Sequence, residues 1–560
     1  MKTTVSTTTV LKKIAFFVTL FPVLLNANMY RYSFCGYDLD EGTRSILLLD
    51  QTLISDPSLY PFLNCTEISF CNPFGNAPAI EDDYSNLKEW ERYFNGKLTT
   101  EAIVNGFYRT TFLDFDQFKK DHTLKNYVPK TELERFILAS PNTKELLPYF
   151  WFAKKCELIY QGQYQLEYSW YQGESIAKSN EDFQQMYQEA IALYNSTNDA
   201  FLKNRIGFQI VRLAFELGVS EPTEHVFNTY MKYDESSKYI YYKAMERNAT
   251  MLYRRGKKVE SLEQFRQVFE NLQDRKDDVF LSLQRLPMGE LDLSQHPQEK
   301  EFLHFSYGFR GNHIAALKEI LAINPNSTYA EVLAMRYFDS LHAISFGDTL
   351  LNDEGESMFT NMEQAVEIVD NQLGNVVVKN KELWFLFKGI IEIAYKDYEA
   401  ATRMFTKKYT NQAYKSQADI LVYATKVAQL QEFDRNAMNQ LFLELKRDKN
   451  LYSNHGVRGF YFQKMSQLYA NSDQTIISVF LTYQPRHYSE NKVEEDNQLS
   501  SDLYPNYFFY EKYKYLKEEE LLTLKALITA PTKTKLEQFI VSLLPKDPTD
   551  FVNEMLGTYY

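Results

Sequence analysis

Residues 384–408 read WFLFKGIIEIAYKDYEAATRMFTKK, a pattern of two amphipathic helices joined by a short turn. Apolar and small residues recur at helical spacing before and after the turn, at Phe385, Gly389, Tyr398, Ala401 and Phe405. Residues spaced three or four apart share one face of a helix. Because Gly389 and Ala401 are small, we expect the two helices to approach each other closely at this pair. The stretch therefore predicts a helical hairpin.

Three further stretches show the same order of helix, turn and helix, at 201–230, 245–272 and 304–325. A glycine stands at each expected turn (Gly218, Gly256 and Gly311), and glycine readily adopts the positive φ that ends a helix. The residues expected to face the partner helix are Ile206, Ile210, Leu213, Leu217, Val226, Phe227 and Tyr230 in the first stretch, Ala249, Leu252, Phe265 and Val268 in the second, and Ala316 and Ile320 in the third.

The offsets in 384–408 resemble the tetratricopeptide repeat, a helical hairpin of about 34 residues. Four residues match the repeat position by position, namely Gly389, Tyr398, Ala401 and Phe405. Lys388 and Glu392 replace the usual Leu and Tyr, and the three turn glycines lie 38 and 55 residues apart, so the period is irregular. The resemblance covers about 146–345 and 380–445. It implies an α-solenoid of degenerate hairpins, which stack and leave an extended concave surface.

Three segments are similar to signatures of exported repeat proteins from Gram-negative bacteria, a group whose function is uncharacterised. They are FWFAKKCE (150–157), NRIGFQIVRLAFELG (204–218) and YIYYKAMERNATMLYRRGKKVES (239–261). This second resemblance implies export and a helical-repeat fold, and it assigns no catalytic residue.

The composition limits the classes of protein to which the chain can belong. Its 560 residues include only 20 Gly and 17 Pro, too few for an all-β fold with its frequent turns. Apolar residues make up 44 %, which excludes global disorder. The net charge of −13 gives no general attraction to nucleic acid or anionic lipid. We therefore expect an all-α fold and no nucleic-acid partner.

Changes in texture divide the chain into five expected regions. Residues 1–28 have the layout of a secretory signal peptide, with Lys12 and Lys13 before an apolar run that is too short to span a bilayer. The other four are an irregular N-terminal module at 29–145, tetratricopeptide-like hairpins at 146–345, further hairpins at 346–480 and C-terminal helices at 481–560. We expect an exported chain, in the periplasm or associated with the outer membrane, without an integral membrane span.

The cysteines and the C-terminus leave alternatives open. Cys65 and Cys71 lie six residues apart, and in an oxidising compartment they either form a bridge or remain free thiols. Lipid attachment at Cys35 is disfavoured, because Tyr32 and Phe34 stand where a Leu-like and a small residue are needed. Leu556-Gly557-x-x-Tyr560 matches the core of a first repeat helix. We expect either an incomplete repeat that exposes Leu556 and Tyr560, or a capping helix over 551–560.

No set of residues predicts catalysis, a metal site or a cofactor site. The chain has no Gly-rich phosphate loop, HExxH pair or GxSxG elbow. Asp114 and Asp116 could serve acid–base cleavage of a glycan, and His304 and His313 could meet across one hairpin. The carboxylates of DLDEG (38–42) lack the EF-hand spacing for calcium. We expect these residues to lie on the surface or in packing, and we assign no catalytic, metal-binding or cofactor-binding residue.

Aromatic residues are abundant, at 15 % of the chain. They are densest at Tyr239, Tyr241 and Tyr242 and again in 507–515. We expect most of them to pack between helices and a minority to line the concave surface, where aromatic side chains stack on glycans or anchor peptides.

The expected function is a non-enzymatic scaffold that binds protein partners of the cell envelope on a helical-repeat concave surface. One alternative is a glycan-binding protein of outer-membrane nutrient uptake, of the SusD-like kind, which the missing lipid signal disfavours. Another is a polysaccharide-degrading enzyme on a helical toroid, for which the carboxylate evidence is weak.

Overall fold

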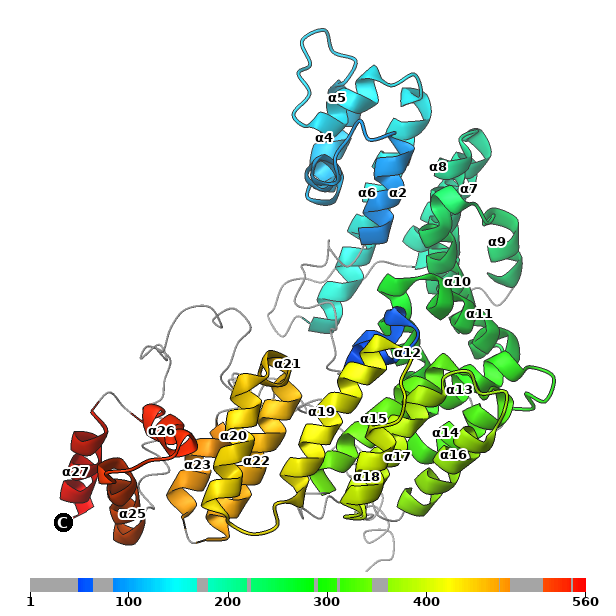
Figure 1. Ribbon diagram of the computed structural model, residues 1–560. Coiled ribbons are helices and arrows are strands. Elements are labelled where there is room, and N and C mark those ends of the chain that lie inside the picture. The colour runs from blue at the N-terminus through cyan, green and yellow to red at the C-terminus, as the bar shows by residue number, and fades with distance from the viewer. Residues whose placement is uncertain are drawn as a thin grey trace, which may run out of the picture. The chain divides into compact units, whose positions relative to one another are not determined.

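A computed structural model shows a chain built from helices (Figure 1). It describes residues 49–63, 84–168, 180–218, 223–286, 291–309, 313–344, 361–472, 474–483, 517–544 and 547–559. The structure is 78 % helical, and the described residues contain no strand. The predicted all-α fold is therefore confirmed. The expected signal peptide, Cys35, Cys65, Cys71, the DLDEG carboxylates and the aromatic run at 507–515 lie outside the described residues.

Two compact units divide the chain. One comprises Leu49–Asp419, and the other comprises Ile420–Tyr560 together with Met1–Leu48. The division falls within helix α19 (Gln412–Gln429). Among the described residues, no helix combines the length and the apolar character that crossing a bilayer requires.

The described part of the expected N-terminal module is helical. It contains α2 (Tyr84–Tyr93), α3 (Thr100–Ile103), the π-helix η5 (Val104–Tyr108), α4 (Phe112–Asp121), α5 (Glu132–Ala139) and the start of α6 (Thr143–Tyr168). Threonine side chains cap α3, α4 and α5, because Thr99, Thr111 and Thr131 each accept a hydrogen bond from the backbone N–H three residues later.

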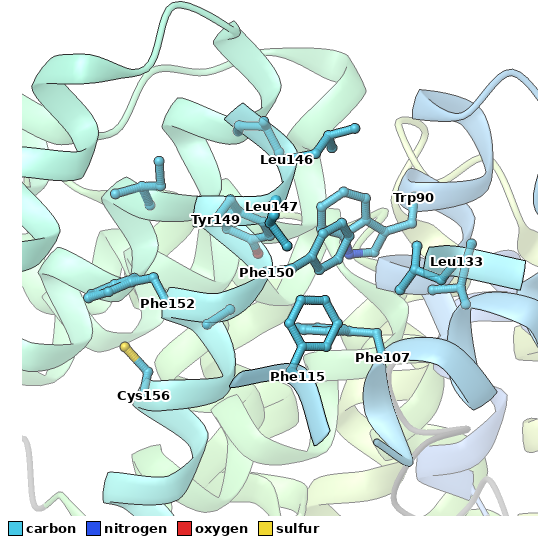
Figure 2. Packing of buried hydrophobic residues seen from close by; sticks show 14 of the residues in the cluster. Trp90, Phe107, Phe115, Leu133, Leu146, Leu147, Tyr149, Phe150, Phe152 and Cys156 are labelled. Carbon is cyan, nitrogen blue, oxygen red and sulfur yellow. The ribbon is translucent and has the colours of Figure 1, made fainter. Parts of the chain in front are cut away.

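Aromatic side chains fill the core of this region (Figure 2). Trp90 of α2 stacks on Phe150 of α6 with ring centroids 5.0 Å apart, and Phe107 meets Phe150 edge-on at 4.8 Å. The buried Cys156 lies in the same cluster, and burial raises the pKa of its thiol. The cluster runs from Leu87 to Leu213, so the expected border at 145/146 falls inside one hydrophobic core.

Consecutive helices then pack against each other as hairpins. Their bounds are α7 (Asn180–Ser196), α8 (Ala200–Leu217), α9 (Thr223–Tyr230), α10 (Lys238–Arg254), α11 (Lys258–Asn271), α12 (Lys276–Arg285), α13 (Pro297–Gly308), α14 (His313–Ile323), α15 (Thr328–Ile344), α16 (Met362–Gly374), α17 (Lys381–Ala394) and α18 (Tyr398–Phe405). The pairs α7 with α8, α10 with α11, α13 with α14, and α17 with α18 make the most extensive of these contacts.

The predicted turns at Gly218 and Gly256 are confirmed, and the third expected turn, at Gly311, lies outside the described residues. Gly218 and Gly256 have φ angles of 60° and 79°, the left-handed conformation that ends a helix. Ala249 and Phe265 are fully buried between α10 and α11. Ser261, which stands where the repeat has Ala, donates a hydrogen bond of 2.7 Å from its buried hydroxyl to the Ala249 carbonyl oxygen. A polar side chain thus satisfies its own hydrogen bond at the crossing.

The close approach of α17 and α18 is confirmed at Gly389, with a different partner. A Cβ added to Gly389 would lie 2.9 Å from Cδ1 of Phe405 and closer still to Cε1 and Cζ. The expected partner was Ala401, which is buried but does not make the closest contact. The aromatic ring reaches further than the Ala401 methyl group, so it fills the space that glycine leaves.

Replacing Gly389 by leucine is expected to lower the free energy of unfolding by about 1–3 kcal/mol, because the added side chain overpacks the Phe405 ring. Gly374→Leu is the matched control, since a Cβ at the exposed Gly374 meets no atom within 4 Å. Urea unfolding followed by circular dichroism measures both variants. Equal stability of the two would contradict the crossing at Gly389.

The second unit contains part of α19 and six longer helices among its described residues. These are α20 (Arg435–Arg447), α22 (His455–Ala470), α23 (Thr475–Tyr483), α25 (Glu518–Thr529), α26 (Lys535–Ser542) and α27 (Pro548–Tyr559), with the short α21 (Lys449–Ser453) between α20 and α22. Helix α27 packs on α25. Val552 is fully buried and Leu556 is half-buried, so α27 does not expose its apolar face completely.

Candidate peptide-docking surface

Residues 49–63 form a short segment that packs on helices far away in the chain. It contains two 3₁₀ helices, η2 (Gln51–Leu53) and η3 (Pro57–Leu63), drawn in blue near α12 in Figure 1. The side chain of Asp50 accepts a hydrogen bond from Thr52 N at 2.8 Å, and that of Asp56 accepts one from Ser58 N at 2.9 Å. These aspartates cap the two helices locally, so the segment presents a preformed backbone.

Apolar side chains anchor the segment. Leu53, Ile54, Leu59, Phe62 and Leu63 are all buried, with at most 5 % of each exposed. The Phe62 ring lies among four other phenylalanine rings, with centroid distances of 5.4–5.9 Å to Phe269, Phe280, Phe305 and Phe309. These four belong to α11, α12, α13 and the residue that follows α13. The segment therefore inserts an aromatic anchor where three helices meet.

Side chains of the helices also bind the main chain of the segment. The hydroxyl of Tyr414 donates to Leu53 O at 2.8 Å, and Gln273 donates to Ser58 O at 3.0 Å. Glu331 Oε2 accepts from both the backbone N–H and the hydroxyl of Ser55, each at 2.7 Å.

Two further contacts lie at the ends of the segment. Gln417 Oε1 accepts from Asp50 N at 2.9 Å, and Arg336 donates to Phe62 O at 2.8 Å. We call these partners together the docking surface: Phe269, Gln273, Phe280, Phe305, Phe309, Glu331, Arg336, Tyr414 and Gln417. Main-chain contacts of this kind hold a peptide largely regardless of its side chains, while pockets for a few anchors give specificity.

Asn380 orients two of these side chains. It lies just before α17, and its Nδ2 donates to Glu331 Oε1 at 3.1 Å and to the hydroxyl of Tyr414 at 2.6 Å. Both acceptors in turn bind the segment. Such a shared partner restricts the two side chains that contact the segment, which lowers the entropy cost of holding the segment in place.

Two adjacent charged residues at the start of α12 have shifted pKa values. Burial lowers the pKa of Lys276 to about 8, although Asp56 of the segment opposes the shift. Its Nζ donates to Phe269 O at 2.7 Å and lies 4.1 Å from the centroid of the Phe269 ring. Burial, with repulsion from Asp278, raises the pKa of Asp277 to about 6.

Relative to the natural chain, the Asp277→Asn variant is expected to gain about 1 kcal/mol in free energy of unfolding between pH 4 and pH 7. The folded state binds the Asp277 proton more tightly than the unfolded state, so its contribution to stability falls as the pH rises through this range. Asparagine does not titrate. Urea unfolding at the two pH values tests this expectation, and a constant difference would contradict it.

The carboxylates considered for acid–base chemistry hold local structure. Asp114 accepts a hydrogen bond of 2.6 Å from the hydroxyl of Thr111, and this bond lowers its pKa. Asp116 lies 2.5 Å from Lys120 Nζ and 3.0 Å from Trp151 Nε1, and both contacts lower its pKa. A general acid of a glycosidase needs a raised pKa, and neither residue has one.

The two histidines have different partners. His304 Nε2 lies 3.9 Å from Glu319 Oε2, and burial lowers its pKa. His313 Nε2 lies 3.4 Å from Arg336 Nε. Within the described residues, no group of three or more His, Cys, Asp or Glu could hold a metal ion.

The tyrosine cluster at 239–242 serves mainly in packing. Tyr239 and Tyr242 are buried, and Tyr241 packs on Phe227 of the preceding helix at 5.5 Å. The exposed Tyr233 meets Tyr241 edge-on at 5.4 Å and donates to Glu235 Oε2 at 2.6 Å. The packing interpretation therefore describes this cluster, with Tyr233 at its edge.

Sequence reasoning did not identify the docking surface. The density of Leu and Phe in 49–63 was the available signal, but these residues have no helical period that would indicate their partners. Comparison with models of protein families, with curated proteins and with solved structures finds no significant match. The fold and the site define a class on physical grounds alone: an all-α protein that holds a short segment of two 3₁₀ helices on packed helices.

Proposed function

We propose that the chain is a non-enzymatic binding scaffold that holds short segments of protein partners on its docking surface. In this proposal the tetratricopeptide-like hairpins stack as an α-solenoid, and the docking surface is part of its concave side. The signal-like N-terminus supports export to the periplasm or the outer membrane. The partners would then be proteins of the cell envelope.

The docked segment 49–63 supports this function most directly. Its main-chain contacts come from five side chains, those of Gln273, Glu331, Arg336, Tyr414 and Gln417, which lie in η7 (Gln273–Arg275), α15 and α19. Two backbone N–H groups of the segment, at Asp50 and Ser55, donate to these side chains, and the carbonyl groups of Leu53, Ser58 and Phe62 accept from them. The anchor site around Phe62 is lined by aromatic rings, which suits an apolar side chain better than a sugar hydroxyl.

Binding of a labelled peptide tests the proposal. The peptide has the sequence of residues 49–63, and the protein is the full chain carrying Phe62→Ala. That variant weakens the docked segment and leaves every residue of the docking surface in place. In the natural chain the tethered segment competes at an effective concentration on the order of millimolar.

We expect saturable binding to the variant, weaker binding to the natural chain and none by a peptide of scrambled sequence. Fluorescence anisotropy measures all three. If the natural-sequence peptide binds neither protein, or the scrambled peptide binds equally well, the proposed function is wrong.

A further inference from the structure

One residue of the docking surface carries a charge that its present partners compensate poorly. Arg336 lies on α15, and its Nη1 donates to Phe62 O at 2.8 Å and reaches Leu63 O at 3.5 Å. Its Nε lies 3.4 Å from His313 Nε2, and its guanidinium carbon lies 4.6 Å from the centroid of the Phe309 ring. Among the described residues, no carboxylate forms an ion pair with Arg336. Burial lowers its pKa to about 10.

A guanidinium in such a place is normally paired. Arginine presents five N–H donors in a planar fork, which matches the two oxygens of a carboxylate. Two other arginines of this region have carboxylate partners. Arg275 makes bidentate contacts of 2.8–3.0 Å with Glu246, and Arg266 lies 2.9 Å from Glu299. Arg336 instead meets two neutral carbonyl groups at the end of η3. The partial negative charge of a helix C-terminus compensates a cation less than a full carboxylate does.

We infer that the docking surface prefers a partner peptide that ends at the position of Leu63, so that its C-terminal carboxylate pairs with Arg336. An apolar, preferably aromatic, residue precedes it and takes the place of Phe62. This inference rests on the proposed function and adds the chemistry of the partner.

A terminal carboxylate fits the geometry better than an acidic side chain does. Arg336 lies against the last two main-chain carbonyl groups of the segment. A chain that ends at this position has one carboxylate oxygen where Leu63 O now lies and the second where the next backbone nitrogen would otherwise be. Arg336 Nη1 already lies 3.5 Å from Leu63 O, so a carboxylate at this position comes within reach of the guanidinium. In the chain itself Leu63 is followed by Asn64, so its carbonyl group is part of a peptide bond and carries no net charge. Residues 49–63 therefore form the weaker occupant, which such a partner displaces.

Two peptides that differ in a single group test the inference. Both have the sequence of residues 49–63 and the same N-terminal label, and one ends in a free carboxylate and the other in an amide. Each is titrated into the full chain carrying Phe62→Ala, and into the same chain with Arg336→Gln added. The charge of the rest of the peptide is identical, so the comparison isolates the terminal group.

We expect the acid to bind at least about tenfold more tightly than the amide, and the difference to disappear with Arg336→Gln. Arg336→Lys is a second variant and should keep part of the preference, since it retains the charge without the fork. Equal affinities of acid and amide for the Phe62→Ala chain would overturn the inference and leave the proposed function standing. A preference that persists in Arg336→Gln would also overturn it. If neither peptide binds, the proposed function itself fails.

Discussion

Replacing Phe62 by alanine is expected to lower the free energy of unfolding of the Leu49–Asp419 unit by about 3–5 kcal/mol. The Phe62 side chain is 2 % exposed and contacts four phenylalanine rings. Its removal leaves a cavity lined by residues of several helices, which cannot all move to fill it. The loss cannot exceed the free energy that holds the segment in place, because beyond that limit the segment leaves the docking surface.

Urea unfolding followed by circular dichroism measures this loss. Gln51→Ala is the control within the same segment, because Gln51 is exposed and its replacement should change stability by no more than about 0.5 kcal/mol. Phe62→Leu should fall between the two. If Phe62→Ala is as stable as Gln51→Ala and its segment exchanges amide hydrogens no faster, the packing around Phe62 is wrong.

Replacing Glu89 by alanine is also expected to lower the free energy of unfolding by about 3–5 kcal/mol, for an electrostatic reason. Glu89 of α2 and Arg205 of α8 are both buried and lie 3.0 Å apart. Glu89 Oε1 also accepts from Tyr239 N at the start of α10, at 2.5 Å. Burial raises the pKa of Glu89 despite the nearby arginine, so the site tolerates charge only as a pair. Removing the carboxylate leaves a buried guanidinium without its counter-ion.

A double-mutant cycle separates the pair from its surroundings. Arg205 also donates to Asn86 at 2.6 Å and lies 4.2 Å from the centroid of the Trp90 ring. A methionine at position 205 keeps much of the apolar contact with Trp90. We expect Glu89→Ala with Arg205→Met to be more stable than Glu89→Ala alone, because no unpaired charge remains. Additive losses from the two changes would contradict a coupled pair.

The helical hairpins could be predicted because their signals are local. A short window of sequence shows both the turn glycine, at Gly218 or Gly256, and the spacing of three or four residues between apolar positions. The approach at Gly389 was predicted for the same reason. Its true partner, Phe405, is in the predicted hairpin too, but the choice between Ala401 and Phe405 depends on how far each side chain reaches, and spacing does not determine this.

The docking surface and the buried ion pair could not be predicted, because their partners are distant in the chain. Leu53 and Tyr414 are 361 residues apart, and Glu89 and Arg205 are 116 apart. Short 3₁₀ helices have no extended hydrophobic period, so residues 49–63 read as an irregular stretch. The same lack of a local signal concealed Arg336, whose importance follows only from the carbonyl groups that it meets.

Amide hydrogen exchange of residues 49–63 in the natural, full-length chain is the most direct test of the central claim that this segment is held on the packed helices. Several of its amides are bonded, including Ser55 N to Glu331 and Leu59 N to Asp56 O at 3.1 Å. The predicted result is exchange as slow as that of α11 and α15, which carry part of the docking surface. Exchange at the rate of an unstructured peptide, while α11 and α15 remain protected, would contradict the account.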